Sequence, residues 1–275
     1  MASRNPNLIR MAAAGAITLP LLLGAAACSD DKDDAAKDVV TTTVRAGGAS
    51  TSADPFCDLA VEADGAVNAA RGGEEPDPAA VENAKKAIEA AQKAAPSDIA
   101  DAVGTVASET LAGFENPEGG PSETFETSYG SMIQWVRSNC GFERLDVTGM
   151  DYHFAGIPEE LDAGKATVKF ANEGTEMHEM LFFRIADDVT ASIDELLALP
   201  EEESMSKVEM RGAVFAMPGA EAWSTLDLEA GRYAVLCFIP VGTTPEAAAE
   251  MEATGAQPDG PPHFSQGMVH ELTVS

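Results

Sequence analysis

The sequence predicts an α+β protein in which a small helical domain precedes a Greek-key β-sandwich. Residues 55–141 are rich in Ala, Glu and Lys, and their apolar residues recur every three or four positions, which is the helical period. From residue 145 onward, short apolar or alternating runs are separated by Gly, Pro and Asn, which is typical of strands and turns. We therefore expect helices over 55–141 and a sandwich over 145–275.

The first 27 residues have the pattern of a signal peptide. Arg4 and Arg10 come before the apolar run AAAGAITLPLLLGAAA, which is too short and too rich in small residues for a membrane span. Cys28 follows three alanines directly and so resembles the cysteine of a bacterial lipobox. This resemblance implies a lipoprotein, with a palmitate-type lipid anchor on Cys28, at the extracytoplasmic side of the cell membrane. An ordinary secreted protein is the alternative.

Residues 28–54 are predicted to be a flexible linker. They are acidic at first and then rich in Thr, Ser and Gly, and they have no hydrophobic period. Such a stretch cannot bury enough apolar surface to offset the entropy lost on ordering. We expect it to tether the folded domains to the membrane.

The charge balance of the whole chain bears on its partners. The chain has 17 Lys and Arg against 46 Asp and Glu, a formal net charge of −29. Nucleic-acid-binding proteins need a basic face, so we expect no nucleic-acid partner. A partner with a basic surface is favoured instead.

Of the four cysteines, one is expected to remain an unpaired thiol. If Cys28 is lipidated, Cys57 and Cys140 bracket the helical block and form the natural disulfide pair in an oxidising compartment. Cys237 then has no partner. It is either an inert core cysteine or a metal ligand.

The helical block carries clear boundary signals. Asp77 is an expected N-cap, followed by Pro78 at the first helical position, and the run AAVENAKKAIEAAQKAA continues to Pro96. Ser97 is expected to cap the next helix. No catalytic cluster is visible in this block.

The second half contains five runs of strand type and two brief helical stretches, DELLAL and TPEAAAEMEA. The residues 200–212 are expected to be a solvated loop. The strand-type runs are LDVTGMDYHF, KATVKFAN, EMLFFRI, STLDLEAGRYAVLCFI and MVHELTV.

Four side chains of this half form a candidate metal site. His178 follows an Asn-Glu-Gly turn, Cys237 ends the run GRYAVLC, and His263 and Met268 stand four residues apart near the end of the chain. A thiolate, two imidazoles and a weak thioether are the ligands of a mononuclear blue-copper site. Taken singly, each has an ordinary interpretation, as a strand-end histidine, a core cysteine, a loop histidine and a core methionine.

In the order of the chain, four segments resemble the cupredoxins, the family of plastocyanin and azurin. The segments are DYHFAGIPEELDAGKATVKFAN, NEGTEMH, LEAGRYAVLC and PHFSQGMVHELTV. The resemblance covers residues 145–275 and implies a cupredoxin-like sandwich that binds one copper ion. It implies His178, Cys237 and His263 as equatorial ligands and Met268 as the axial ligand.

The chain departs from the small cupredoxins between two of these ligands. The insert, residues 238–262, places 25 residues between Cys237 and His263, where the small members have a few. Closing a longer loop costs only about 0.6 kcal/mol for each doubling of its length. Two effects of the insert stay open: it holds His263 out of reach of Cys237, or it covers the edge of the site where an electron partner would dock.

The predicted function is single-electron transfer by a copper protein, with no enzymatic activity. Its expected partner is an unknown redox or copper-exchange protein. Two alternatives remain: a copper carrier or chaperone, and a metal-free interaction module anchored in the envelope. His153 and His270 match no ligand position and are expected at the surface or behind the ligands.

Overall fold

The computed structural model describes residues 54–71, 77–116 and 122–275. Residues 1–53, which include the expected signal peptide, Cys28 and nearly all of the expected linker, lie outside this part. Among the described residues, no helix has the length and apolar character needed to cross a membrane.

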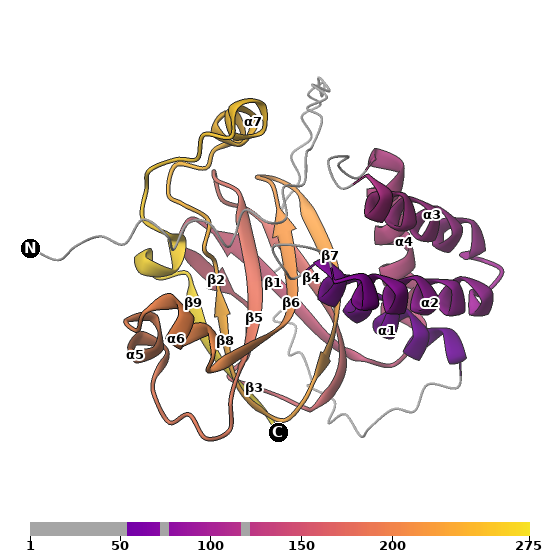
Figure 1. The fold of residues 1–275 in the computed structure, drawn as a ribbon, viewed down its shortest axis with the longest axis horizontal. Helices are drawn as coiled ribbons and strands as arrows, with labels where there is room; N and C mark the ends of the chain where they lie inside the picture. Colours follow the sequence, from indigo (N-terminus) through magenta and orange to yellow (C-terminus); the bar gives the residue numbers. More distant parts are fainter. Residues whose placement is uncertain (1–53, 72–76, 117–121) are drawn as a thin grey trace, which may run out of the picture.

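Four helices among the described residues form the first domain (Figure 1). Asp77 caps the second helix by accepting a hydrogen bond from the N–H of Ala79, and Pro78 stands at its first position, as predicted. Ser97 does not cap the third helix, because a turn closed by the Ile99 N–H and the Pro96 carbonyl comes first. The helices are α1 (Pro55–Arg71), α2 (Pro78–Ala94), α3 (Ala100–Glu115) and α4 (Glu123–Asn139).

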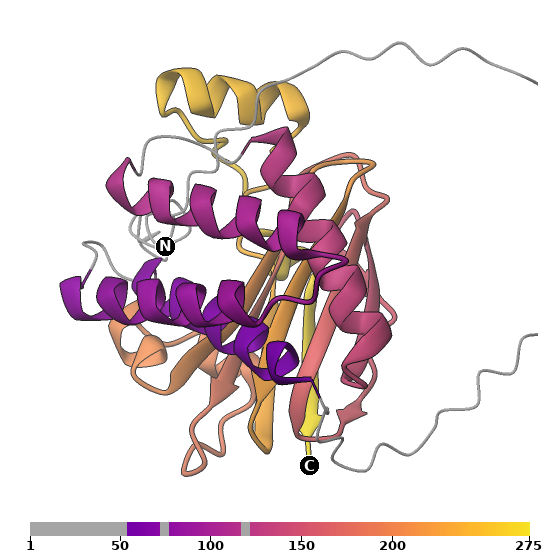
Figure 2. The ribbon, with the colours of Figure 1, turned by 90° about the vertical axis from the view of Figure 1, so that its right-hand side faces the viewer.

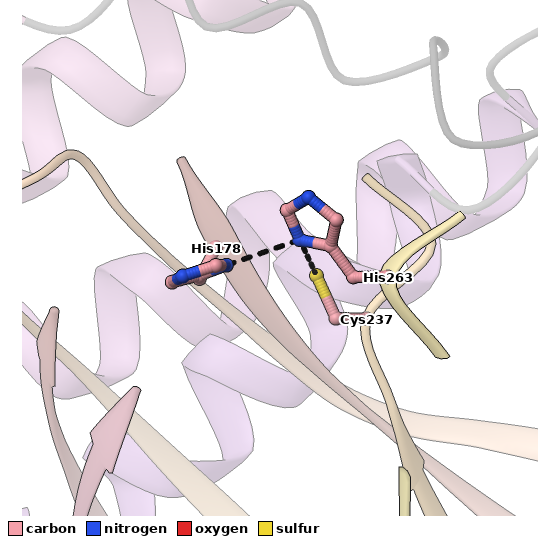
Figure 3. Close-up of side chains that lie close together, drawn as sticks. All are labelled: His178, Cys237 and His263. Atoms are coloured by element: carbon pink, nitrogen blue, oxygen red, sulfur yellow. Dashed lines mark hydrogen bonds between the residues drawn. The ribbon is translucent and has the colours of Figure 1, made fainter. Parts of the chain in front are cut away.

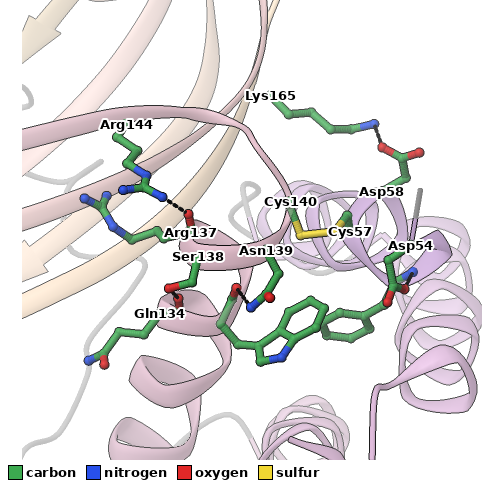
Figure 4. The surroundings of a disulfide bond; sticks show 12 residues. Asp54, Cys57, Asp58, Gln134, Arg137, Ser138, Asn139, Cys140, Arg144 and Lys165 are labelled. Carbon is green, nitrogen blue, oxygen red and sulfur yellow. Dashed lines mark hydrogen bonds and ion pairs between the residues drawn. A yellow bond between two sulfur atoms is a disulfide. The ribbon is translucent and has the colours of Figure 1, made fainter. Parts of the chain in front are cut away.

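The expected disulfide is confirmed. Cys57 in the first turn of α1 is bonded to Cys140, which ends α4, so the bridge joins the two ends of the helical domain (Figure 4). Both sulfurs lie in the domain's core, beside the fully buried Phe56, Ile133 and Val136.

The rest of the chain is a sandwich of two sheets. The four-stranded sheet has the order β2 (His153–Ala155), β1 (Glu143–Met150), β4 (Gly164–Asn172) and β7 (Glu221–Leu228). The five-stranded sheet has the order β3 (Glu160–Leu161), β9 (Val269–Val274), β8 (Gly231–Leu236), β5 (His178–Ile185) and β6 (Val208–Ala216). Apolar side chains from both sheets fill the space between them, so the predicted α+β architecture with a cupredoxin-like sandwich is confirmed.

Three further local predictions, all in the sandwich, are wrong. The run STLDLEAGRYAVLCFI is two strands, β7 and β8, which belong to different sheets. Residues 200–212 are not a solvated loop, because they contain the short helix α6 (Glu201–Met205) and the first part of the edge strand β6, which pairs with β5. Val214 and Ala216 face the core, but the exposed Glu209 and Met210 at the other end of the strand conceal its apolar pattern. The run LDVTGMDYHF is two strands, because the chain reverses at Tyr152, whose φ is +64°.

The helical domain lies against the outer face of the four-stranded sheet (Figure 2). Trp223 of β7 packs against the core of the helical domain, and polar contacts surround it. Arg137 of α4 donates to the Thr167 carbonyl and hydroxyl oxygens, both at 3.2 Å, and forms an ion pair with Asp146 at 2.7 Å. Asp58 of α1 pairs with Lys165 of β4 at 2.7 Å (Figure 4). These contacts fix the helical domain on the sheet without using the sandwich core.

Three short helices complete the fold. Helices α5 (Ile193–Leu197) and α6 (Glu201–Met205) cover the outer face of the five-stranded sheet. Helix α7 (Pro245–Thr254), capped by Thr244, lies in the insert after Cys237 and stands at one end of the sandwich (Figure 1). A 3-10 turn, η3 (His263–Gln266), then leads into β9.

Candidate metal centre

Three of the predicted ligands meet at one end of the sandwich. His178 is the first residue of β5, and Cys237 directly follows the last residue of β8. Because these two strands are antiparallel neighbours, the start of one lies beside the end of the other. His263 begins η3, which brings it to the same end.

The donor atoms converge closely (Figure 3). The Nδ1 atoms of His178 and His263 are 3.1 Å apart, and the Cys237 Sγ lies 3.4 Å from the His263 Nδ1. One ligand atom from each residue lies within 4.8 Å of the others. All three side chains have an exposed fraction of 0%.

Burial opposes charge on all three side chains. Burial, together with the positive charge that His263 carries when protonated, lowers the pKa of His178, and burial lowers the pKa of His263. Burial also raises the pKa of the Cys237 thiol. A neutral imidazole keeps one unprotonated nitrogen that can bind a cation, and a cation beside the thiol would favour its ionisation.

These residues fit a copper ion. Two imidazoles and one thiol make the trigonal donor set of a blue-copper site. The Nε2 of His178 is buried without a hydrogen-bond partner and lies 3.4 Å from Asp151 Oδ1, so a nearby carboxylate faces the outer side of this ring. The inward Nδ1 atoms have no anionic partner and face each other, as two ligands of one cation would.

Met268 lies in the expected region, but its sulfur stays a predicted ligand. Its side chain is fully buried in the sandwich core. Its carbonyl accepts from the Cys237 N–H at 3.2 Å, and its N–H donates to the His263 carbonyl at 3.1 Å. The main chain of Met268 is thus tied to two of the clustered residues.

The other two histidines lie outside the cluster. His153 in β2 is exposed, and the Nε2 of His270 is 3.2 Å from the Pro158 carbonyl oxygen. This agrees with their expected places away from the ligand positions.

The long insert does not displace His263. Its two ends pair with each other: the His263 N–H donates to the Ile239 carbonyl, and the Phe264 N–H donates to the Cys237 carbonyl, both at 2.9 Å. Pro240 and Pro262 form a β-bridge between them. The extra residues therefore loop outward from a closed base, and loop length has little effect on the distance between the two ligands.

Glu176 is a residue of the site that the sequence analysis missed. Its carboxylate is 3.0 Å from the outer nitrogen, Nε2, of His263, and its side chain is nearly buried. Burial acts to raise the pKa of Glu176, but hydrogen bonds from His263, Gly242 and Tyr152 outweigh it and hold the pKa below its ordinary value. The residue stands in the segment NEGTEMH, yet only the fold shows which partner its carboxylate meets.

Comparisons with known proteins give solved structures alone, since no family model and no curated protein matches the chain. A reduced auracyanin from the photosynthetic bacterium Roseiflexus castenholzii is 20% identical, with 48% of this chain and 96% of that chain covered and a TM-score of 0.29. Auracyanin A, a "blue" copper protein from Chloroflexus aurantiacus, is 19% identical, with 48% and 98% covered and a TM-score of 0.28. Reduced rusticyanin is 15% identical, with 48% and 76% covered and a TM-score of 0.26. These TM-scores are too low to assign a function to this chain, so the metal centre is inferred from its own residues.

The sandwich and its buried cluster define the class: a cupredoxin-like protein with the donor set for a single mononuclear copper ion. Within that class, this chain carries a helical domain ahead of the sandwich and a 25-residue insert between two of the clustered side chains.

Proposed function

We propose that this protein is a membrane-anchored, extracytoplasmic copper protein that transfers single electrons. The observation that carries the proposal is the convergence of His178, Cys237 and His263, all fully buried, at one end of a sandwich. A copper ion held there supplies one-electron chemistry between Cu(II) and Cu(I).

The surrounding residues suit an electron carrier. The two histidines and the cysteine come from strand ends and a 3-10 turn that backbone hydrogen bonds hold together, so their geometry changes little between oxidation states. Burial excludes water and any substrate from the donor atoms. We propose Met268 as the axial ligand and no enzymatic activity, because the sequence has no nucleophile elbow or phosphate loop.

The anchor belongs to the same proposal. A lipid on Cys28, followed by a linker of polar residues, would hold the folded part near the outer side of the membrane while letting it reach a redox partner. Mass spectrometry of the intact protein tests this directly. The proposal requires a diacylglyceryl-type mass on Cys28 that disappears in Cys28→Ser, and an unmodified Cys28 would contradict it.

A copper titration tests the redox function. The full chain, purified in detergent, is titrated with Cu(II) and followed by visible absorption and electron paramagnetic resonance. We expect an intense thiolate-to-copper band at about 600 nm, absent from Cys237→Ser. Tight Cu(I) binding without this band would favour a copper carrier instead. No binding of either ion would leave a metal-free interaction module.

A further inference from the structure

We propose that Glu176 is a positioning residue for the metal centre: its carboxylate holds the ring of His263 and the start of the insert together, so that the inner nitrogen of His263 faces the other ligands. This inference rests on the proposed copper site but concerns a residue outside its ligand set.

The carboxylate of Glu176 has four partners. Its Oε2 accepts from the N–H groups of Gly242 and Thr243, at 2.6 and 3.1 Å, and lies 3.0 Å from the His263 Nε2. Its Oε1 accepts from the Tyr152 hydroxyl at 3.0 Å. The side chain is 8% exposed, so solvent competes little for these partners.

The contact with Glu176 determines the tautomer of His263. An ionised carboxylate only accepts hydrogen bonds, so its contact with His263 places the ring proton on Nε2. A neutral imidazole carries one proton, and Nδ1 is then left with a lone pair. That lone pair is directed toward the Cys237 Sγ and the His178 Nδ1, where a cation would bind.

Glu176 also binds the start of the insert. Gly242 and Thr243 lie five and six positions after Cys237, near the start of the insert, and His263 directly follows its end. One carboxylate therefore binds both sides of the loop. Gly242 has a φ of +96°, a conformation that glycine adopts without strain, and its N–H makes the shortest of the four contacts.

Tyr152 has an unusual backbone conformation and contacts both Glu176 and His263. A bulky residue with φ of +64° occupies a sparsely populated region, and such residues persist where the surroundings hold them. Here the hydroxyl of Tyr152 is bonded to Glu176, while its ring packs edge-on against His263 with the centroids 5.0 Å apart. Tyr152 thus supports both the carboxylate and the ring that the carboxylate holds.

The test compares Glu176→Gln with Glu173→Gln. Both changes remove one negative charge from the same turn, but Glu173 is exposed. In the metal-free protein, nitrogen NMR reports the tautomer of His263, and hydrogen exchange reports the protection of the Gly242 and Thr243 amides. We expect Glu176→Gln to lose the Nε2–H preference and the amide protection, and Glu173→Gln to keep both.

Copper binding gives an independent measurement. We expect Glu176→Gln to weaken copper affinity about 10–100-fold, the usual effect of removing a group that orients a metal-bound histidine. We also expect a higher reduction potential, because a nearby negative charge favours Cu(II) over Cu(I). A role in folding alone would lower stability without changing the tautomer or the potential.

The outcomes separate this inference from the proposed function. An unchanged tautomer and unchanged amide protection in Glu176→Gln would overturn the positioning role, even if copper still bound. Failure of the wild-type protein to bind copper would refute the proposed function, while the metal-free measurements would still decide the role of Glu176. If Glu176→Gln fails to fold, Glu176→Asp is measured in its place, because it keeps the charge but withdraws it by one methylene, and the same losses are expected.

Discussion

The Nδ1 atoms of His178 and His263 lie 3.1 Å apart, although 85 positions of the chain separate the two residues. The antiparallel pairing of β5 with β8 sets one side of this contact, and the pairing of the insert's two ends sets the other. Both side chains are buried, and in the described part of the chain the carboxylate contacts of these rings are at Nε2 rather than Nδ1. The pair is therefore arranged to share a cation.

Removal of one ring tests whether both imidazoles bind the metal. His178→Ala should lose the thiolate-to-copper band and at least about 100-fold in copper affinity, because a ligand contributes more than the 10–100-fold typical of an orienting group. His153→Ala is the control, since His153 is exposed and lies outside the cluster. Isothermal titration and visible spectra provide the comparison. Equal copper binding by the two variants would exclude His178 as a ligand.

Met268→Leu tests the predicted axial ligand. The two side chains have similar volumes, so the free energy of unfolding should fall by less than about 1.5 kcal/mol. If the thioether binds copper, the reduction potential should change, because the axial ligand tunes it. Voltammetry measures the potential, and urea denaturation checks the stability. An unchanged potential would show that Met268 is a core residue only.

The disulfide should stabilise the helical domain more than the metal site. Its two cysteines are 83 positions apart, so replacing both Cys57 and Cys140 by Ser should lower the free energy of unfolding by about 4–5 kcal/mol in the chain-entropy model. The copper band should persist, because the ligands lie in the sandwich. Denaturation followed by circular dichroism tests the first expectation, and a copper titration of the same variant tests the second. Loss of the band would mean that the site depends on the helical domain.

Asp64 should give a distinct pH dependence to stability. It belongs to α1 and contacts β7, and it accepts hydrogen bonds from the Thr225 N–H and hydroxyl and from the Tyr129 hydroxyl. Burial raises the pKa of Asp64, although these hydrogen bonds and Arg71 act against the increase. The folded protein thus holds the proton more tightly than the unfolded chain does. The contribution to stability is greatest below the ordinary value of 3.8 and declines as pH rises through the folded pKa.

Asp64→Asn should remove this decline. Urea denaturation from pH 3.5 to 7 gives the free energy of unfolding of the wild type and of the variant. As pH rises over that range, the wild type should lose stability relative to the variant. Asp227→Asn, at an exposed position of β7, provides the control. A difference that stays constant with pH would show that Asp64 titrates as it does in the unfolded chain.

The sequence predicted the elements whose signals are local. Asp77 with Pro78 marked the start of a helix, and alternating apolar residues marked most of the strands, because capping and side-chain period depend on neighbouring residues alone. The pairing of Cys57 with Cys140 was predicted from the expected oxidising compartment and from the number and positions of the cysteines. Strand β6 was missed because its first four side chains are exposed or only partly buried, which removes the apolar pattern from that end.

The sequence by itself determined the residue types available to the site: two histidines, one unpaired cysteine and a methionine, in an order shared with cupredoxins. Only the tertiary structure decided that His263 reaches Cys237 across the 25-residue insert, since that depends on backbone pairing between the ends of the loop. The structure alone also placed Glu176 against His263 and made Tyr152 adopt a positive φ. Such contacts join residues far apart in the chain, and their geometry is set by the packing of both sheets rather than by any local pattern.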